Sequence, residues 1–327
     1  MNRDVLRKIG IGLVVLIGVG LLAGTYYMDR KEQKYVQASV ENLQKEDKLD
    51  MKKSGLDSKD QEWQRKLEKK KNGNSNVVIL ADNIEQSLYD TVYKRMQELN
   101  WLGVMVLTDG EVPGGQAGSI TQEQFDEMVG NGWNYAFSVS TSIEEKGVSG
   151  WLSTLDQNIA KWEKAGIANS GIAVCQVGQY SESDKEEIKQ ALSARGFRAL
   201  FIIYENDISL AGAYEDSWNE MESVLLREDY SNVTTMMNSA MNEGKSMSVT
   251  IGKVTEQPQD TGRELSPAKF DRFINQMYDM QDKGYKVLSY TDYESDRKET
   301  NGELAQMQKE YEAFLQEKEQ KLKELEK

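Results

Sequence analysis

The sequence predicts an α/β protein whose main body, residues 76–300, is a distorted (β/α) barrel. From residue 76 onward, short apolar segments alternate with segments of helical period, which predicts a parallel sheet covered by helices. The apolar segments lack polar alternation, as is typical of strands buried on both faces. About eight such strands in roughly 220 residues favour a barrel with an irregular or missing unit. An open doubly wound sheet is the alternative.

The apolar segment 9–28 precedes this body and contains no charged residue. Twenty helical residues cross a hydrocarbon core of about 30 Å. Because Arg3, Arg7 and Lys8 precede the segment, we expect residues 1–8 to stay in the cytoplasm. We therefore predict an uncleaved signal anchor that spans the bilayer once; a cleaved signal peptide is the alternative.

This topology places the body outside the cytoplasm, at the cell membrane. The single cysteine, Cys175, excludes an internal disulfide, which fits a bacterial and Gram-positive cell surface.

Residues 29–75 are rich in Lys, Glu, Asp and Gln, and predict a charged helical stalk that ends in a linker. An apolar stripe begins at Val36, Val40 and Leu43 but is not continued, so the pattern does not support a long coiled coil. We expect the stalk helix to break near residues 54–55.

The body follows in a regular order of strands and helices. The strands are predicted at 77–80, 102–107, 135–139, 172–177, 198–203, 224–226, 248–251 and 287–290. The helices are predicted at 84–99, after the capping box at 121–124, and at 151–164, 183–194, 233–241 and 266–283. No G-x-G-x-x-G motif follows the first strand, so the sequence gives no support for dinucleotide binding.

A second charged helix, residues 301–327, is predicted at the C-terminal end. Leu304, Met307, Tyr311 and Phe314 are spaced to share one face, and the stripe is lost beyond Phe314. Packing on the stalk, packing on a partner and a solvated tail all remain open for this helix.

Composition excludes several classes of function. The chain has no histidine, so Ser-His-Asp and Cys-His nucleophile pairs and a His-ligated catalytic zinc are excluded. Residues 74–300 carry 36 acidic and 19 basic side chains, so this body would repel nucleic acid and anionic lipid. Neutral and cationic ligands remain compatible with this charge.

Residues 76–290 resemble the polysaccharide deacetylases that contain a NodB-homology domain. The most specific stretch is 119–141, SITQEQFDEMVGNGWNYAFSVST, which follows an apolar strand, a helix and a second apolar strand. The resemblance implies a distorted (β/α) barrel of the NodB-homology type.

The resemblance also places the reacting groups of the family on this chain, and most are absent. The family's catalytic base falls on Ala81 and its metal-binding aspartate on Asp82. Its two metal-binding histidines fall on Ser138 and Ser142. Because one aspartate cannot hold a metal in place of an Asp-His-His set, we expect no catalytic residue, metal or cofactor of the family's kind.

The former active-site face is instead expected to bind a ligand through hydrogen bonds and stacking. The candidate binding residues are Asp82, Asn83, Ser138, Ser140 and Ser142 as hydrogen-bonding groups, with Tyr180 and Tyr204 as stacking faces.

The leading hypothesis is a membrane-anchored, extracytoplasmic and catalytically inactive deacetylase-like protein. It would bind an envelope polysaccharide or peptidoglycan-type glycan, or an envelope protein, with residues 9–28 in the lipid bilayer.

One alternative is a carbohydrate-active hydrolase, either a deacetylase with an altered site or a glycosidase. Such a glycosidase would use acidic residues at strand ends, among them Asp82, Asp109, Glu111, Glu205 and Asp207. The other alternative is a scaffold that acts through the stalk and tail helices.

Overall fold

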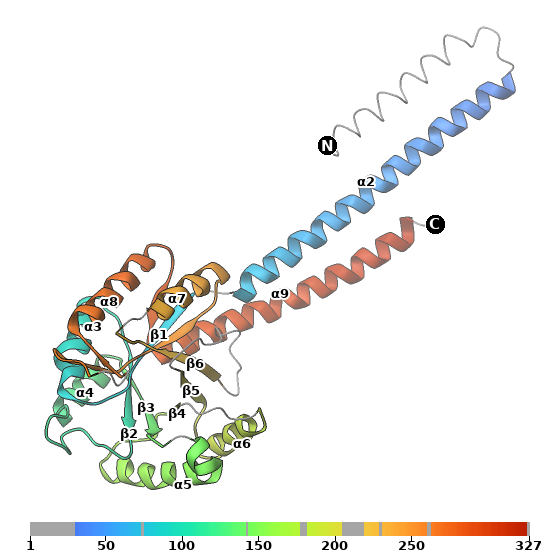
Figure 1. Cartoon of the computed structure of the whole chain (residues 1–327). Helices are drawn as coiled ribbons and strands as arrows, with labels where there is room; N and C mark the ends of the chain where they lie inside the picture. The colour runs from blue at the N-terminus through green and yellow to red at the C-terminus, as the bar shows by residue number, and fades with distance from the viewer. Residues whose placement is uncertain are drawn as a thin grey trace. The chain divides into compact units, whose positions relative to one another are not determined.

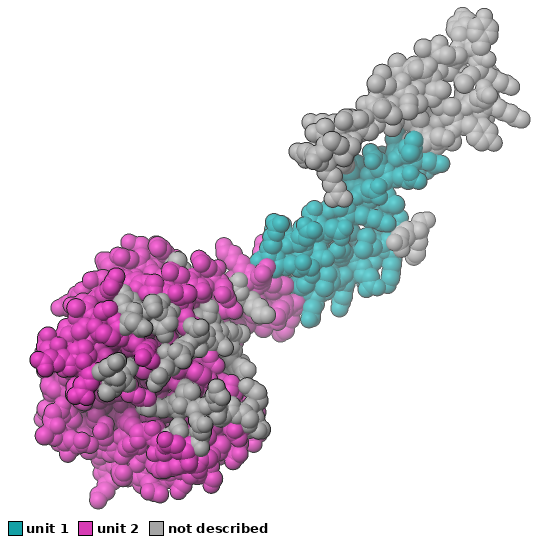
Figure 2. All heavy atoms as spheres, in the orientation of Figure 1, with its two compact units in different colours: residues 1–65, 310–327 teal, residues 66–309 magenta. Residues whose placement is uncertain are grey.

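The structure is a computed structural model that describes residues 30–72, 75–141, 143–176, 182–204, 219–228, 231–259 and 263–325. The predicted membrane segment 9–28 lies outside these ranges. Within them, no helix is long and apolar enough to span a bilayer. The chain divides into two compact units, 66–309 and 1–65 with 310–327 (Figure 2).

Unit 66–309 contains a closed barrel, which confirms the predicted (β/α) architecture (Figure 1). Seven parallel strands form the ring in the described residues: β1 (Asn76–Ala81), β2 (Val104–Thr108), β3 (Asn134–Val139), β4 (Ile172–Gln176), β5 (Ala199–Tyr204), β6 (Asn219–Leu225) and β7 (Met247–Ile251). Each strand pairs with the next, and β1 pairs with β7 from Val77↔Met247 to Ala81↔Ile251. This last pairing closes the sheet and excludes the open doubly wound alternative.

The predicted eighth strand does not become an eighth member of the ring. It is β10 (Lys286–Leu288), which pairs in parallel with the first half of β1, from Asn76 to Val78. The end of β1 pairs with β2, at Leu80↔Val104 and Ala81↔Met105. One edge of β1 is occupied by β7. The other edge is therefore shared by β10 and β2. This is the irregular unit that the strand count indicates.

Side chains alternate between the barrel interior and the helical layer outside it. Residues such as Val78, Leu80, Val106 and Val174 form the interior cluster, which Tyr290 and Tyr293 also join. The outward residues form a second, larger cluster with the helices. These helices are η2 (Leu88–Tyr93), a π-helical turn, α3 (Lys94–Glu98), α4 (Gln122–Gly130), α5 (Ile143–Lys164), α6 (Glu182–Ser193), α7 (Ser231–Glu243) and α8 (Pro267–Gln281).

Both long helices differ in extent from the prediction. Helix α2 (Arg30–Asn72) is continuous through Gly55, so the expected break there is wrong. A glycine in a helix costs about 0.5–1 kcal/mol relative to alanine, which a helix of this length tolerates. Helix α9 runs from Tyr290 to Leu325, so the predicted start at residue 301 falls within it.

In unit 1–65 with 310–327, α2 and α9 contact each other. Tyr311 and Lys318 of α9 both donate hydrogen bonds to the Asp60 carboxylate of α2, over 2.6 and 2.7 Å. The Trp63 and Tyr311 rings lie 6.3 Å apart. The tail helix therefore packs on the stalk, and polar residues form part of this contact, which an apolar pattern in the sequence does not reveal.

The turn after β7 depends on Gly252. A Cβ atom there would lie 1.9 Å from the carbonyl oxygen of Arg263. This close approach allows the short strands β8 (Lys253–Val254) and β9 (Glu264–Leu265) to pair, and Lys253 N donates to that same carbonyl over 3.0 Å.

We predict that Gly252→Ala lowers the free energy of unfolding by about 1–3 kcal/mol, because the added methyl group would push the backbone at residue 252 away from the carbonyl of Arg263. Gly302→Ala is the matched control, since a Cβ there meets nothing within 4 Å in α9. The control should gain about 0.5–1 kcal/mol. Urea denaturation of the full chain measures both changes, and equal stability of the two variants would contradict the role of Gly252.

Candidate functional site

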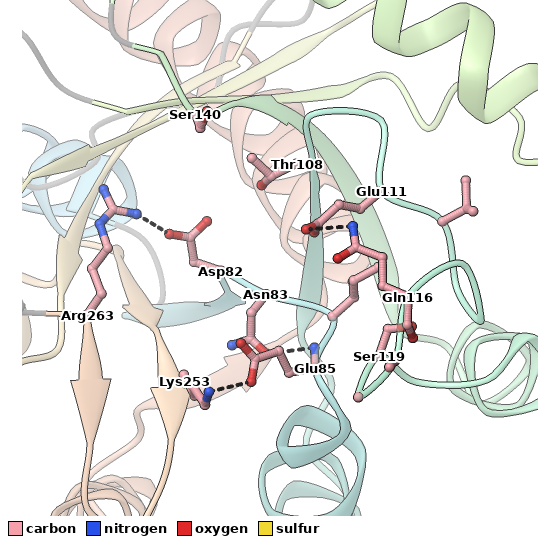
Figure 3. Close-up of a pocket in the computed structure, with 14 residues that line it drawn as sticks. Asp82, Asn83, Glu85, Thr108, Glu111, Gln116, Ser119, Ser140, Lys253 and Arg263 are labelled. Carbon is pink, nitrogen blue, oxygen red and sulfur yellow. Dashed lines mark hydrogen bonds and ion pairs between the residues drawn. The ribbon is translucent and has the colours of Figure 1, made fainter. Parts of the chain in front are cut away.

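A polar cavity of about 880 Å³ opens beside the carboxyl ends of β1, β2 and β3 (Figure 3). Barrel proteins build their sites on this face, because the loops that follow parallel strands meet there. The polar lining residues are Asp82, Asn83, Glu85, Thr108, Glu111, Gln116, Ser119, Ser140, Lys253 and Arg263. They come from the strand ends, from the loop between β2 and α4, and from the β8–β9 pair.

Asp82 lies at the first position after β1 and is held by both backbone and side chain. Its N–H donates to the carbonyl of Ile251 over 2.8 Å, which extends the β1–β7 pairing. Its carboxylate accepts a hydrogen bond from Arg263 Nη1 over 2.7 Å. The Asp82 side chain is 3% exposed, whereas that of Arg263 is 41% exposed. The guanidinium therefore pairs with a buried carboxylate and still reaches the cavity.

A second ion pair lies on the same wall. Lys253 Nζ is 2.8 Å from Glu85 Oε2, and this contact raises the pKa of Lys253. The side-chain oxygen of Asn83 accepts from the Glu85 N–H over 3.1 Å, which fixes the start of the loop after β1. Lys253 of β8 and Arg263, which directly precedes β9, thus supply two cations to two carboxyl groups of that loop.

Asp109 links the ends of β2 and β3. Its backbone has a φ of 54°, and its carboxylate accepts from both the N–H and the hydroxyl of Ser140, the former over 3.0 Å. Lys161 of α5 donates to the Asp109 carbonyl over 3.2 Å. The left-handed backbone, which aspartate tolerates better than most residues, turns the chain toward Glu111.

Glu111 is held at the cavity by a contact from outside the barrel. Trp162 stacks on Phe137 of β3 with ring centroids 4.1 Å apart, and its indole N–H donates to the Glu111 carbonyl over 2.7 Å. The Glu111 carboxylate accepts one long hydrogen bond, of 3.5 Å, from Gln116. Burial raises the pKa of Glu111, and the nearby charges of Asp109 and Glu85 raise it further.

The structure brings together three of the predicted binding residues, Asp82, Asn83 and Ser140. Ser138 is fully buried one layer deeper in the barrel, and its hydroxyl has no hydrogen-bond partner among the residues that the structure describes. It does not line the cavity because residues 138 and 140 face inward at successive levels of β3. Tyr204, at the end of β5, packs against the outer apolar cluster and does not line the cavity either. Ser142 and Tyr180 lie outside the described residues.

Sequence reasoning missed Arg263 and Lys253. Neither belongs to a recognisable motif, and the only signal is that both follow the predicted strand at 248–251. Because parallel strands end on the same face of the barrel, residues that follow this strand lie near Asp82. The ion pair of Arg263 with Asp82, however, depends on the close approach of Arg263 to Gly252.

The resemblance to deacetylases implies a catalytic metal, and the described residues do not fit one. No group of three His, Cys, Asp or Glu side chains gathers there as metal ligands. Asp82, which the resemblance assigns to metal binding, is instead paired with a guanidinium. The positive charge of Arg263 would repel a cation at that carboxylate.

The protein is thus a closed parallel (β/α) barrel. Its mouth, the cavity at the carboxyl ends of β1, β2 and β3, is polar and contains the ion pairs Asp82–Arg263 and Glu85–Lys253. The chain is similar to peptidoglycan deacetylase PdaC from Bacillus subtilis, with 11% identity and a TM-score of 0.44 over 72% of this chain and 98% of that chain. It is similar to a putative polysaccharide deacetylase from Mycobacterium smegmatis, with 12% identity and a TM-score of 0.44 over 70% and 92% of the two chains.

Solved deacetylases, the family that the sequence resembles, are thus among the structures similar to this chain. An aldolase, DAHP synthase from Thermotoga maritima, is also similar, with 13% identity and a TM-score of 0.36 over 65% of this chain and 70% of that chain. No protein-family model matches the chain, and no curated protein matches its sequence. These likenesses concern the fold and by themselves assign no activity.

We predict that Arg263→Gln destabilises the protein by about 1–3 kcal/mol, because it removes the cation from a buried carboxylate. The double variant Asp82→Asn/Arg263→Gln should recover part of that loss, since no buried charge then needs a partner. Arg195→Gln is the control, because its ion pair with Asp156 is exposed and worth at most about 1 kcal/mol. Urea denaturation of the wild type, Asp82→Asn, Arg263→Gln and the double variant measures the coupling energy of the pair. Purely additive effects of the two single substitutions would show that the pair is not coupled.

Proposed function

We propose that this protein binds an envelope glycan in the polar mouth of its barrel, and that it does so without metal-dependent deacetylation. The observation that carries the proposal is the ion pair between Arg263 and Asp82, which occupies the carboxylate that a metal would need. The remaining lining supplies the groups that sugars require. Thr108, Ser119 and Ser140 offer hydroxyls, and Asn83 and Gln116 offer amides.

The size and openness of the mouth support a glycan more than a small buried ligand. Sites for drug-sized molecules measure about 300–1,000 Å³ and are mostly apolar. This cavity, of about 880 Å³, is at the upper end of that range and is mainly polar. Hydrogen-bonding groups on several walls suit a chain of hydroxyl-bearing rings, which can be held without a deep apolar pocket.

We expect the full-length protein in detergent to bind peptidoglycan fragments or chitin oligosaccharides and to release no acetate from them. Thr108→Val should weaken binding several-fold, because one hydrogen bond is worth about 0.5–1.5 kcal/mol. Ser138→Ala is the matched control, since Ser138 is buried and does not line the cavity. Calorimetry measures binding, and an acetate assay measures turnover. Steady acetate release by the wild type, abolished in Asp82→Ala, would refute the proposal.

A hydrolase is the second candidate, and Glu111 favours it. A carboxyl group whose pKa is raised by burial can act as a general acid, as glycoside hydrolysis requires. In that case the cavity would cleave a glycan that it binds, and Glu111→Gln would lower the rate by orders of magnitude. Measurement of new reducing ends in the binding assay distinguishes the two candidates.

The proposal includes the location of the protein. Residues 9–28 anchor it in the cell membrane with a single span, and the barrel lies outside the cytoplasm of a bacterial, Gram-positive cell. The uncharged length of that segment and the basic residues before it support this arrangement.

We predict that the full-length chain stays in the membrane fraction after a carbonate wash, and that protease added to intact protoplasts digests the barrel. Replacement of the two most central leucines, Leu16 and Leu21, by arginine should release the protein from the membrane fraction, because each arginine costs about 2.5–3.5 kcal/mol at the centre of a span. A soluble wild-type form that begins near residue 25 would identify a cleaved signal peptide instead.

A further inference from the structure

Four carboxyl groups of the described residues lie in and beside the cavity, and they differ in how their charge is balanced. Asp82 has Arg263, and Glu85 has Lys253. Asp109 is held by two hydrogen bonds from Ser140. Glu111 has no ion-pair partner in the described part of the chain, and its only side-chain hydrogen bond comes from Gln116 over 3.5 Å.

The surroundings of Glu111 make its negative charge costly. The carboxyl group is partly buried, and Asp109 and Glu85 repel it, so its pKa is raised. The acidic excess of residues 74–300, 36 against 19 basic side chains, adds a negative field around the cavity. A cation placed beside Glu111 would remove this cost, because opposite charges a few ångströms apart favour the ionised form.

The protein fixes the backbone of Glu111 beside the cavity. The Trp162 indole fixes the Glu111 carbonyl from outside the barrel, and Lys161 fixes the preceding turn through the Asp109 carbonyl. Beyond the turn, Gly114 N donates to the Ile120 carbonyl over 2.7 Å, and Ile120 N donates to the Ile84 carbonyl over 2.9 Å. The loop that carries Glu111 is therefore tied to α5 on one side and to the segment after β1 on the other.

We infer that the cavity takes a sugar with a free amino group, whose ammonium pairs with the Glu111 carboxylate. This inference rests on the proposed function and names its ligand class. A bare metal ion fits less well, because no group of three metal-binding side chains gathers in the described residues. The hydroxyls of Thr108 and Ser140 and the amide of Asn83 would bind the ring hydroxyls of the same sugar. Such ligands arise when a glycan is N-deacetylated, so a reaction of that class supplies the form that this protein binds most tightly.

The test compares two tetrasaccharides that differ only in their acetyl groups. The probes are the tetramer of N-acetylglucosamine and the tetramer of glucosamine, titrated into the full-length protein in detergent at a pH where the amines are protonated and Glu111 is ionised. We expect the glucosamine tetramer to bind at least about tenfold more tightly, as a charge-assisted hydrogen bond allows. This preference should shrink in high salt.

The isosteric variant Glu111→Gln should lose about tenfold or more in affinity for the glucosamine tetramer and keep its affinity for the acetylated one. Glu187→Gln is the matched control, because Glu187 is exposed on α6 and does not line the cavity. A salt-sensitive loss in both variants would show that the general negative field, and not Glu111, attracts the amine.

The outcomes separate this inference from the proposed function. Equal binding of the two tetramers, or an equal loss of both in Glu111→Gln, would overturn the amino-sugar inference and leave glycan binding standing. Absence of binding to both tetramers and to peptidoglycan fragments, in a protein that unfolds cooperatively, would overturn both.

Discussion

The parallel pairing of β1 with β7 is the contact on which the barrel and its site depend. Five residue pairs, from Val77↔Met247 to Ala81↔Ile251, join the beginning of the fold to its end. The hydrogen bond from Asp82 N to the Ile251 carbonyl extends this ladder by one residue. Closure therefore brings Asp82 beside Gly252 and the strands that carry Lys253 and Arg263. Residues 181 positions apart in the chain become an ion pair for this reason.

The helical layer outside the barrel sets the other wall of the cavity. Phe137 points outward from β3 and stacks on Trp162, and the indole N–H of Trp162 then reaches the loop that carries Glu111. An apolar contact thus fixes the backbone of the residue that carries a carboxyl group on the polar face. Since core side chains occupy well-defined rotamers, this coupling sets where the Glu111 side chain begins, and the long bond from Gln116 contacts the carboxylate itself.

The two walls of the cavity differ in charge balance, and this difference links the proposed function to its ligand class. The wall built by β1 and the β8–β9 pair is internally neutral, because each carboxylate meets a cation. The wall built by the loop after β2 keeps an unbalanced carboxylate. A glycan can use the hydrogen-bonding groups of both walls, whereas a positive charge on the ligand is stabilised only at the second.

The sequence by itself predicted the alternation of strands and helices and favoured a parallel barrel with an irregular unit, and the pairing of β1 with β7 then decided for the barrel over an open sheet. Buried parallel strands read as unbroken apolar segments such as 77–80, and the capping box at Thr121 and Gln124 marks a helix start that the structure confirms. The resemblance to the deacetylases also placed Asp82, Asn83 and Ser140 on one face of the barrel, and all three line the cavity. Only the tertiary structure decided that Ser138 is buried, that Arg263 meets Asp82, and that α9 packs on α2 through Asp60, Tyr311 and Lys318. Each of these features depends on distances between residues far apart in the chain, which local patterns of polarity do not encode.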